Sequence, residues 1–273
     1  MAGTLYVVGT PIGNLGDWSE RAKEILKTSD FIAAEDTRVT LKLLNKFEIS
    51  TPMVSYHEHN HKLRGEQIIG RILGGESCAL VTDAGMPAIS DPGEDLVRLA
   101  HQNGITVSSV PGPSALITAL AISGMPSGRF SFEGFLSTAK QSRKEHLNSL
   151  KNDTRTLIFY EAPHKLIYTL KDMLEVFGDR EIALCKELTK LHETVIHTTF
   201  SAALADFETV PPKGEYVMII KGAEETEEQS LTLEQAVLLA KEYQNQGESA
   251  SNAAKLAAKE SGFKKSDIYK SLI

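Results

Sequence analysis

Short apolar runs alternate with amphipathic stretches through the first 123 residues. The apolar runs span residues 5–8, 31–34, 53–56, 78–81 and 106–110. After each run, apolar residues recur at helical spacing. These stretches are one that begins at Asp17 and residues 40–46, 62–73, 94–102 and 114–123. Asp17 and Glu20 fit the N-cap and N3 positions of the first helix. The alternation predicts βαβ units, which require parallel strands and right-handed crossovers.

The pattern loosens after residues 124–128, whose sequence Gly-Met-Pro-Ser-Gly is typical of a boundary. Strands are expected at 130–133, 156–160, 182–185, 193–199 and 215–220, and helices at 140–150, 163–176 and 201–207. We therefore expect two α/β domains, residues 1–124 and 125–222. We expect an acidic linker at residues 223–230 and a helical C-terminal extension of three short helices at 231–273. Its outline resembles a helix-turn-helix, but a docked helical tail is the favoured interpretation.

Three turns rich in glycine and proline stand at the ends of apolar runs in the first domain. They are Gly9–Asn14, Asp83–Gly93 and Pro111–Ala115. Ligands bind outside the carboxyl ends of the strands in an open α/β sheet, so we expect one cleft for a nucleotide-like molecule. The first turn is neither a dinucleotide fingerprint nor a Walker motif, because its glycines are four residues apart and no Lys-Ser/Thr follows. Together the turns favour a cofactor with adenosine, amino-acid and sulfonium parts.

The composition is that of an ordinary globular protein, with 41% hydrophobic and 24% charged residues. No apolar stretch approaches the roughly 20 residues of a membrane span, and the N-terminus lacks the basic region of a signal peptide. Two cysteines, Cys78 and Cys185, are too few for a disulfide framework or a zinc site. These features predict a cytoplasmic protein.

The net charge of −7 argues weakly against a nucleic-acid partner, but the charge is unevenly distributed. Residues 140–171 carry seven Lys/Arg and three acidic residues, whereas residues 172–230 carry five Lys/Arg and thirteen acidic residues. A local basic patch steers polyanions even on an acidic protein. A solvated helix face explains the same tract equally well.

The three turns, together with longer motifs, carry a family resemblance. The first turn, the Thr82–Pro87 turn and Val110–Ser114 resemble the three cofactor motifs of the tetrapyrrole methylase superfamily, over roughly residues 4–222. More specific motifs are similar to the superfamily members that methylate a cytidine 2′-hydroxyl in the decoding region of 16S rRNA. These motifs are Ala34–Arg38, Tyr56–Asn60, Asp83–Gly93, Gly134–Leu136, Tyr160–His164 and Lys186–Lys190. A Thr-Asp-Ala second turn, where porphyrinoid enzymes usually have Gly-Asp-Pro, argues against a porphyrinoid substrate.

The resemblance implies S-adenosylmethionine as methyl donor, bound between two α/β domains of a homodimer that acts on 16S rRNA, within the small ribosomal subunit. The cofactor contacts that it implies are Pro11, Ile12, Asp83, Met86, Ser114, Ala115, Tyr160, Leu188, Gly214 and Glu215. The candidate RNA contacts are Arg38, His57, Lys140, Arg143 and Lys144.

A ribose 2′-hydroxyl is a poor nucleophile, so a base or a nearby cation should assist removal of its proton. Asp36, Lys186 and Glu187 are the catalytic candidates, with His57 as a further group that could supply this assistance. Asp36 and Arg38 also fit an internal pair that caps the next helix. The alternating His57, His59 and His61 would share a face only in an extended segment, so we expect a substrate-facing loop there and no metal site.

These observations predict a 2′-O-methyltransferase acting on small-subunit rRNA. A small-molecule methylase of the same superfamily is the first alternative. It would not need the basic tract at 140–171 or the helical extension. A non-enzymatic module that only senses a ligand in the cleft is the second. Methyl transfer to ribosomal subunits separates all three.

Overall fold

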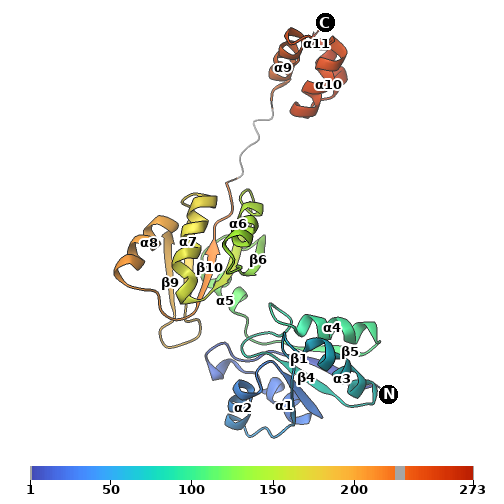
Figure 1. Cartoon of the computed structure of the whole chain (residues 1–273), viewed down its shortest axis with the longest axis vertical. Coiled ribbons are helices and arrows are strands. Elements are labelled where there is room, and N and C mark those ends of the chain that lie inside the picture. The colour runs from blue at the N-terminus through green and yellow to red at the C-terminus, as the bar shows by residue number, and fades with distance from the viewer. Residues whose placement is uncertain (1, 225–230, 273) are drawn as a thin grey trace. The chain divides into compact units, whose positions relative to one another are not determined.

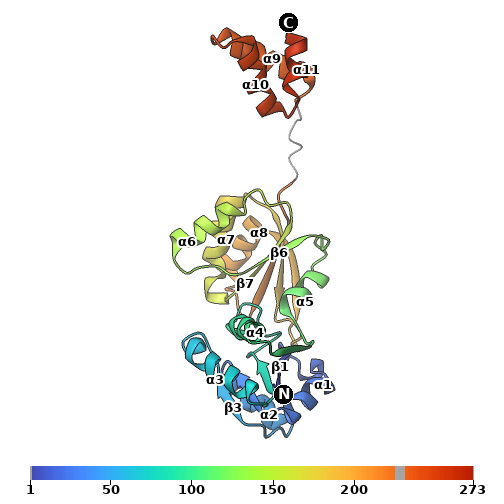
Figure 2. The same cartoon turned by 90° about the vertical axis from the view of Figure 1, so that its right-hand side faces the viewer.

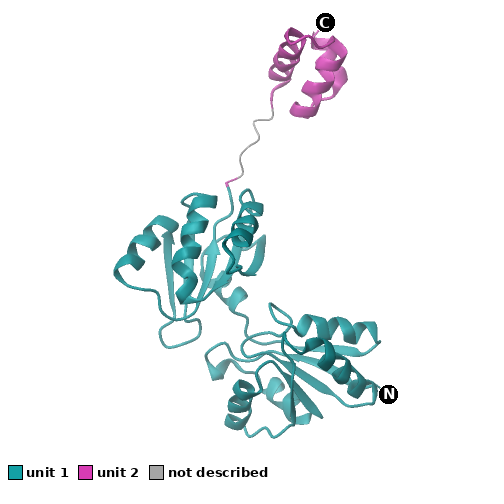
Figure 3. Ribbon diagram, in the orientation of Figure 1, with its two compact units in different colours: residues 1–223 teal, residues 224–273 magenta. Residues whose placement is uncertain are grey.

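The computed structural model describes residues 2–224 and 231–272, in two compact units, Met1–Ala223 and Glu224–Ile273 (Figure 3). Most of the expected acidic linker, residues 225–230, lies outside the described residues. Within the described part of the chain, no helix is both long and apolar enough to cross a membrane.

The first sheet is entirely parallel, as the alternating pattern predicts (Figure 1). Its strand order is β3 (Met53–Ser55), β2 (Phe31–Ala34), β4 (Cys78–Val81), β1 (Thr4–Val8) and β5 (Thr106–Val110). Because successive side chains of a strand point to opposite faces, each face has its own core. On one face Phe31 and Ala33 pack under α3 (His61–Leu73) and α4 (Gly93–Gln102).

The other face of this sheet is covered by α1 (Glu20–Thr28) and α2 (Thr37–Lys46). Ser19, not Asp17, caps α1, since its side chain accepts a hydrogen bond from the backbone N–H of Ala22. Asp17 instead ends a short 3₁₀ helix, η1 (Leu15–Asp17), which places it outside the α-helix and corrects the cap expected from the sequence.

The second sheet is mixed. Its strand order is β6 (Phe130–Phe135), β7 (Thr156–Glu161), β10 (Tyr216–Ile220), β8 (Glu181–Lys186) and β9 (Thr194–Thr199). Only β6 and β7 are parallel; the remaining neighbours are antiparallel. One face is covered by α6 (Lys140–Ser149), α7 (Pro163–Phe177) and α8 (Phe200–Thr209) (Figure 2).

Helix α5 (Ala115–Ile122) covers the other face of the second sheet, although the sequence boundary at residue 124 groups it with the first domain. Its Leu116, Ala119 and Leu120 pack on strands of the second sheet. The sequence Ala-Leu-Ile-Thr-Ala-Leu-Ala-Ile is apolar on every side, so its periodicity does not specify which sheet it covers. The chain therefore passes from one sheet to the other immediately before α5, at the third glycine-rich turn.

The C-terminal unit consists of α9 (Leu233–Asn245), α10 (Ala250–Ser261) and α11 (Lys265–Leu272). A capping box between Thr232 and Gln235 begins α9, and Gly262 ends α10 in the left-handed conformation that glycine favours. Its small core consists of buried alanines with Val237 and Ile268. The three helices thus contribute apolar faces to one another, which helices this short require in water.

Candidate functional site

The three glycine-rich turns of the first sheet meet through their backbones. Thr10 and Gly85 exchange backbone hydrogen bonds, 2.9 Å and 3.2 Å between N and O, which joins the first turn to the second. Gly9 lies directly against Gly112 of the third turn, because a Cβ built on Gly9 would be 2.6 Å from the Gly112 Cα. A side chain at either glycine would separate the turns. The expected convergence of the turns is therefore present.

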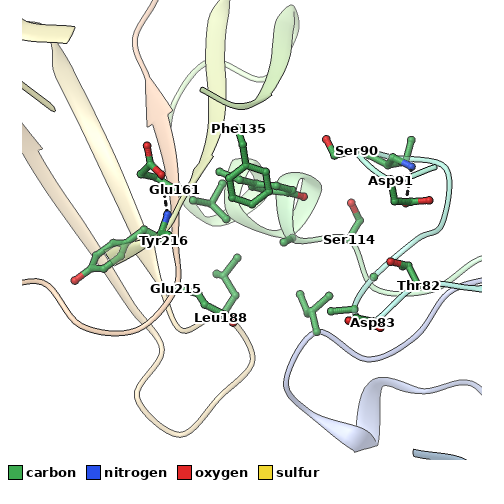
Figure 4. A pocket seen from close by; sticks show the side chains of 18 of the residues that line it. Thr82, Asp83, Ser90, Asp91, Ser114, Phe135, Glu161, Leu188, Glu215 and Tyr216 are labelled. Atoms are coloured by element: carbon green, nitrogen blue, oxygen red, sulfur yellow. Dashed lines mark hydrogen bonds between the residues drawn. The ribbon is translucent and has the colours of Figure 1, made fainter. Parts of the chain in front are cut away.

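A pocket of about 620 Å³ lies where these turns face the second sheet (Figure 4). Thr82, Asp83, Ser90 and Asp91 come from the first sheet's second turn, and residues of β6, β7, β10 and the loop after β8 line the opposite side. This volume is within the range of small-molecule sites. Eight of the ten residues expected to contact a cofactor line it, namely Ile12, Asp83, Met86, Ser114, Ala115, Tyr160, Leu188 and Glu215. Pro11 and Gly214 do not line it, but each directly precedes a residue that does.

Asp83 stands at the centre of a group of carboxylates. Its Oδ1 accepts a hydrogen bond from the backbone N–H of Asp36 at 3.1 Å. The Glu35 carboxylate beside it accepts from the Thr82 hydroxyl. Partial burial raises the pKa of Asp83, and the nearby charges of Glu35 and Asp36 raise it further. A ligand that donates hydrogen bonds to this carboxylate would favour its charged form and so oppose the rise in pKa.

The second turn is held by a carboxylate as well. Asp91 accepts hydrogen bonds from the backbone N–H groups of Ala88, Ile89 and Gly93, at 2.8 to 3.2 Å. Ala88 and Ser90 have positive φ angles of 67° and 66°, which are strained for residues other than glycine. Burial raises the pKa of Asp91, and the three donors oppose that rise. Asp91 thus stabilises a strained loop whose residues line the pocket.

Tyr160 joins the pocket to α5. Its hydroxyl accepts a hydrogen bond from the backbone N–H of Leu116 at 3.0 Å, which provides a partner for one of the free donors at the start of the helix. Its ring packs edge-on against Phe132 and Phe135, with centroids 4.9 Å and 5.4 Å apart. Burial raises the pKa of Tyr160, and the hydrogen bond from Leu116 opposes that rise.

None of the three catalytic candidates lines the pocket. Asp36 caps α2 and forms an ion pair with Arg38, which holds the pKa of Asp36 far below its usual range. Lys186 ends β8. The Glu187 carboxylate accepts from the backbone N–H of Glu215 at 2.9 Å and lies 3.1 Å from the Lys190 ammonium.

Glu187 belongs to a tight loop that contacts the first turn. Glu187 and Thr189 have positive φ angles of 52° and 65°, and the Thr189 hydroxyl accepts from the backbone N–H of Asn14 at 3.1 Å. Gly214, at φ 83°, leaves room for the Glu187 side chain, which a Cβ there would meet at 2.7 Å. Glu187 therefore positions Leu188 and Glu215 at the pocket wall.

The expected RNA contacts lie outside the pocket, and one of them needs correction. Arg143 is buried, with 5% of its surface exposed, and its guanidinium pairs with Asp172 at 2.7 Å. It also donates to the carbonyl oxygens of Ser137 and Thr138. Arg143 faces α7 because its guanidinium pairs with Asp172 there, and the sequence pattern could not separate a core arginine from a surface one. It is not part of an exposed RNA-binding patch.

The other expected RNA contacts differ in whether their polar groups already have partners within the protein. Lys144 pairs with Glu175 at 2.6 Å and the exposed Arg38 pairs with Asp36 at 2.7 Å, whereas Lys140 is exposed and forms no ion pair among the described residues. The His57 Nε2 lies 3.1 Å from the side-chain nitrogen of Asn60, and its Nδ1 is buried without a hydrogen-bond partner among the described residues. Across residues 2–224 and 231–272, no group of three His, Cys, Asp or Glu side chains is placed to hold a metal ion.

Sequence reasoning missed several pocket residues. Glu35 and Asp91 belong to motifs noted in the sequence, but neither was singled out there. Phe135 and His164 also line the pocket. A signal for Glu35 was its position directly after a parallel strand, on the ligand side of the sheet. Phe135 ends β6 and His164 lies in the first turn of α7, within the noted motifs Gly134–Leu136 and Tyr160–His164, and nothing in the local sequence indicates which of their residues face the first sheet.

The sequence and fold place the chain among known proteins. The family model of tetrapyrrole (corrin/porphyrin) methylases matches residues 4–204. The chain belongs to the tetrapyrrole methylase family. It is 47% identical over 272 residues to the ribosomal RNA small subunit methyltransferase I of Xylella fastidiosa (strain Temecula1), with 98% of each chain covered.

Two further comparisons bear on the domains and the fold. The ribosomal RNA small subunit methyltransferase I of Thermotoga maritima is 47% identical over 222 residues, which cover 81% of this chain and 100% of that relative. Among solved structures, the Thermus thermophilus uroporphyrin-III C-methyltransferase complexed with S-adenosylhomocysteine superposes with a TM-score of 0.56 at 18% identity. That comparison covers 80% of this chain and 97% of the other. It shows a shared fold.

Proposed function

We propose that this protein is an S-adenosylmethionine-dependent methyltransferase that methylates the 2′-hydroxyl of a cytidine in the decoding region of 16S rRNA. The observation that carries the proposal is the pocket between three converging glycine-rich turns and the second sheet. It occurs in a chain nearly half identical, over almost its whole length, to relatives named as small-subunit rRNA methyltransferases.

The pocket residues fit the proposed cofactor. Ile12, Met86 and Leu188 provide apolar walls, and Asp83 provides an acceptor for hydroxyl or amino groups. The third turn ends at the start of α5, where backbone N–H groups are available to polar parts of a ligand. S-adenosylmethionine supplies an activated methyl group on a sulfonium centre. The Thermus methyltransferase of the same fold was solved with the corresponding product, S-adenosylhomocysteine.

Methyl transfer is an in-line displacement, so much of the catalysis comes from positioning the two reactants. The turn clamped by Asp91 and the wall held by Glu187 and Tyr160 fix the shape of the pocket. The 2′-hydroxyl must also lose its proton. We assign this role to Glu35, because it lines the pocket directly after β2, whereas we assign Asp83 to the cofactor.

We also propose that the protein acts as a homodimer on the small ribosomal subunit, in the cytoplasm. Two isoleucines of α5, Ile117 and Ile122, are 50% and 41% exposed, and Leu191 is 92% exposed. A second copy could cover such apolar surface. Light scattering on the purified protein tests this assembly, and a monomer at assay concentration would contradict it.

The function is tested by methyl transfer from labelled S-adenosylmethionine to small ribosomal subunits and to free 16S rRNA. Nuclease digestion and mass spectrometry should then identify 2′-O-methylcytidine. An Asp83→Ala variant serves as the control that lacks the proposed cofactor carboxylate. Transfer to a tetrapyrrole but not to rRNA would establish the small-molecule alternative instead. Cofactor binding without any transfer would indicate a ligand-sensing module.

A further inference from the structure

The pocket occupies only part of the ligand side of the first sheet. Its lining from this sheet comes from the turns after β1, β4 and β5, together with Glu35 directly after β2. In the strand order, β2 and β3 continue this edge beyond β4. The carboxyl ends of parallel strands share one edge, so the segments after β2 and β3 extend the site on one side. Helix α2 starts there, at Thr37.

Three exposed cations follow one line along α2. Arg38, Lys42 and Lys46 are each four residues apart, which places successive Cα atoms about 6 Å apart along the helix axis. We call these residues the α2 basic stripe. Helix α2 contains no acidic residue, and among the described residues the only ion pair that involves the stripe joins Arg38 to Asp36. Val39 and Leu41 beside the stripe are also exposed, 41% and 46%.

Some cations on other helices of this unit have partners within the protein. In α1, Lys23 pairs with Glu20, and in α6 Arg143 is buried and Lys144 is paired with Glu175. The helix dipole favours Lys46 in the last turn but disfavours Arg38 in the first turn, so helix stability does not account for the stripe as a whole. Lys42 and Lys46 form no ion pair among the described residues, so their charges are left for a partner in solution.

We propose that the α2 basic stripe binds the sugar–phosphate backbone of a single-stranded rRNA segment next to the nucleotide that enters the pocket. The inference rests on the proposed function. Sequence-specific enzymes take RNA bases from unstacked single strands, whose backbone follows positively charged surfaces. The stripe begins two residues after Asp36, whose backbone N–H contacts Asp83, so a strand along it leads to the pocket.

The test compares two double variants with the same change of charge. Lys42→Glu with Lys46→Glu alters the stripe and leaves Arg38, which holds Asp36, intact. Lys27→Glu with Arg129→Glu alters two exposed cations outside the stripe, the pocket and the 140–171 tract, and serves as the matched control. Binding of a fluorescently labelled single-stranded oligonucleotide with the decoding-region sequence is measured between low and moderate salt. Calorimetry with S-adenosylhomocysteine checks that each variant keeps the pocket.

We expect the stripe variant to bind this RNA at least about tenfold more weakly at low salt. The slope of log K against log salt should be shallower by about 1.4, because two phosphate contacts are lost and each single-strand contact contributes about 0.7. The control should match the parent. Parental binding by the stripe variant, or equal loss in both variants, would overturn the proposal. If the stripe variant fails to bind S-adenosylhomocysteine, the double variant Lys42→Ala with Lys46→Ala replaces it. That variant should also bind the RNA more weakly than the parent.

Methyl transfer by the unaltered protein is measured in parallel. If the parent does not methylate rRNA, the proposed function fails, whatever the stripe does. If the parent methylates rRNA and the stripe variant binds the oligonucleotide normally, only the stripe proposal fails.

Discussion

Replacement of Asp83 should separate cofactor binding from the rest of the site. In the described structure, Asp83 accepts one hydrogen bond, from the backbone N–H of Asp36, so its second oxygen is available to a ligand. Asp83→Asn keeps an acceptor for Asp36 but removes the charge. Asp83→Ala removes both.

The expected size of the effect follows from one charged hydrogen bond. Such a bond contributes about 1.5–3 kcal/mol, which corresponds to a rise in Kd of roughly tenfold to 150-fold. Calorimetry with S-adenosylhomocysteine measures this change. Glu35→Gln is the matched variant, because Glu35 also lines the pocket but is assigned to the proton of the substrate hydroxyl. It should bind S-adenosylhomocysteine like the parent and transfer methyl groups slowly.

The pKa of Asp83 adds a second observable. Because burial raises this pKa, the carboxylate of the ligand-free protein takes up a proton at a higher pH than an ordinary aspartate. A ligand that donates to the carboxylate prefers the charged form, so affinity should fall as the pH is lowered through the raised pKa. Asp83→Asn should lack this fall. Parental affinity in both Asp83 variants would refute the assignment of Asp83 to the cofactor.

Three further variants test other parts of the structure. Glu187→Ala should raise the KM for S-adenosylmethionine several-fold with little change in kcat, because the carboxylate positions Glu215. A fall in kcat alone would instead indicate that Glu187 acts in the methyl transfer itself. Arg143→Ala should lower the free energy of unfolding in urea by about 3–5 kcal/mol, because it leaves Asp172 buried and unpaired, whereas a loss below 1 kcal/mol would contradict that role. Deletion of residues 224–273 should leave S-adenosylhomocysteine affinity nearly unchanged, since every pocket residue precedes them, but reduce methylation of ribosomal subunits. A folded truncated protein that methylates subunits at the parental rate would show that the helices are dispensable.

The Thermotoga relative bears on the last of these predictions. Its full length matches 81% of this chain, so about a fifth of this chain has no counterpart there. The C-terminal unit is a similar share of the chain. A separate helical unit that adds to substrate binding, while the pocket remains in Met1–Ala223, is consistent with this comparison.

The sequence by itself determined the parts of the protein that depend on local pattern. The strands at Phe31–Ala34, Cys78–Val81 and Thr106–Val110 have the bounds that their apolar runs predict. The glycines of the turns were also readable, because close backbone approach at Gly9 and Gly112 excludes any side chain. Alternation of strands and helices then predicted parallel pairing, though not the strand order, and the edge at which ligands bind.

Only the tertiary structure decided which side chains share a surface. Helix α5 is apolar all round, so its place on the second sheet depends on packing and not on periodicity. Arg143 and Lys140 belong to the same basic tract, yet the first is buried against Asp172 and the second is exposed. A count of charges along a sequence does not show which cations have partners, because an ion pair between residues 29 positions apart forms only when two helices pack. For the same reason the sequence did not show that Glu187, a catalytic candidate by motif, accepts a hydrogen bond from the backbone of Glu215.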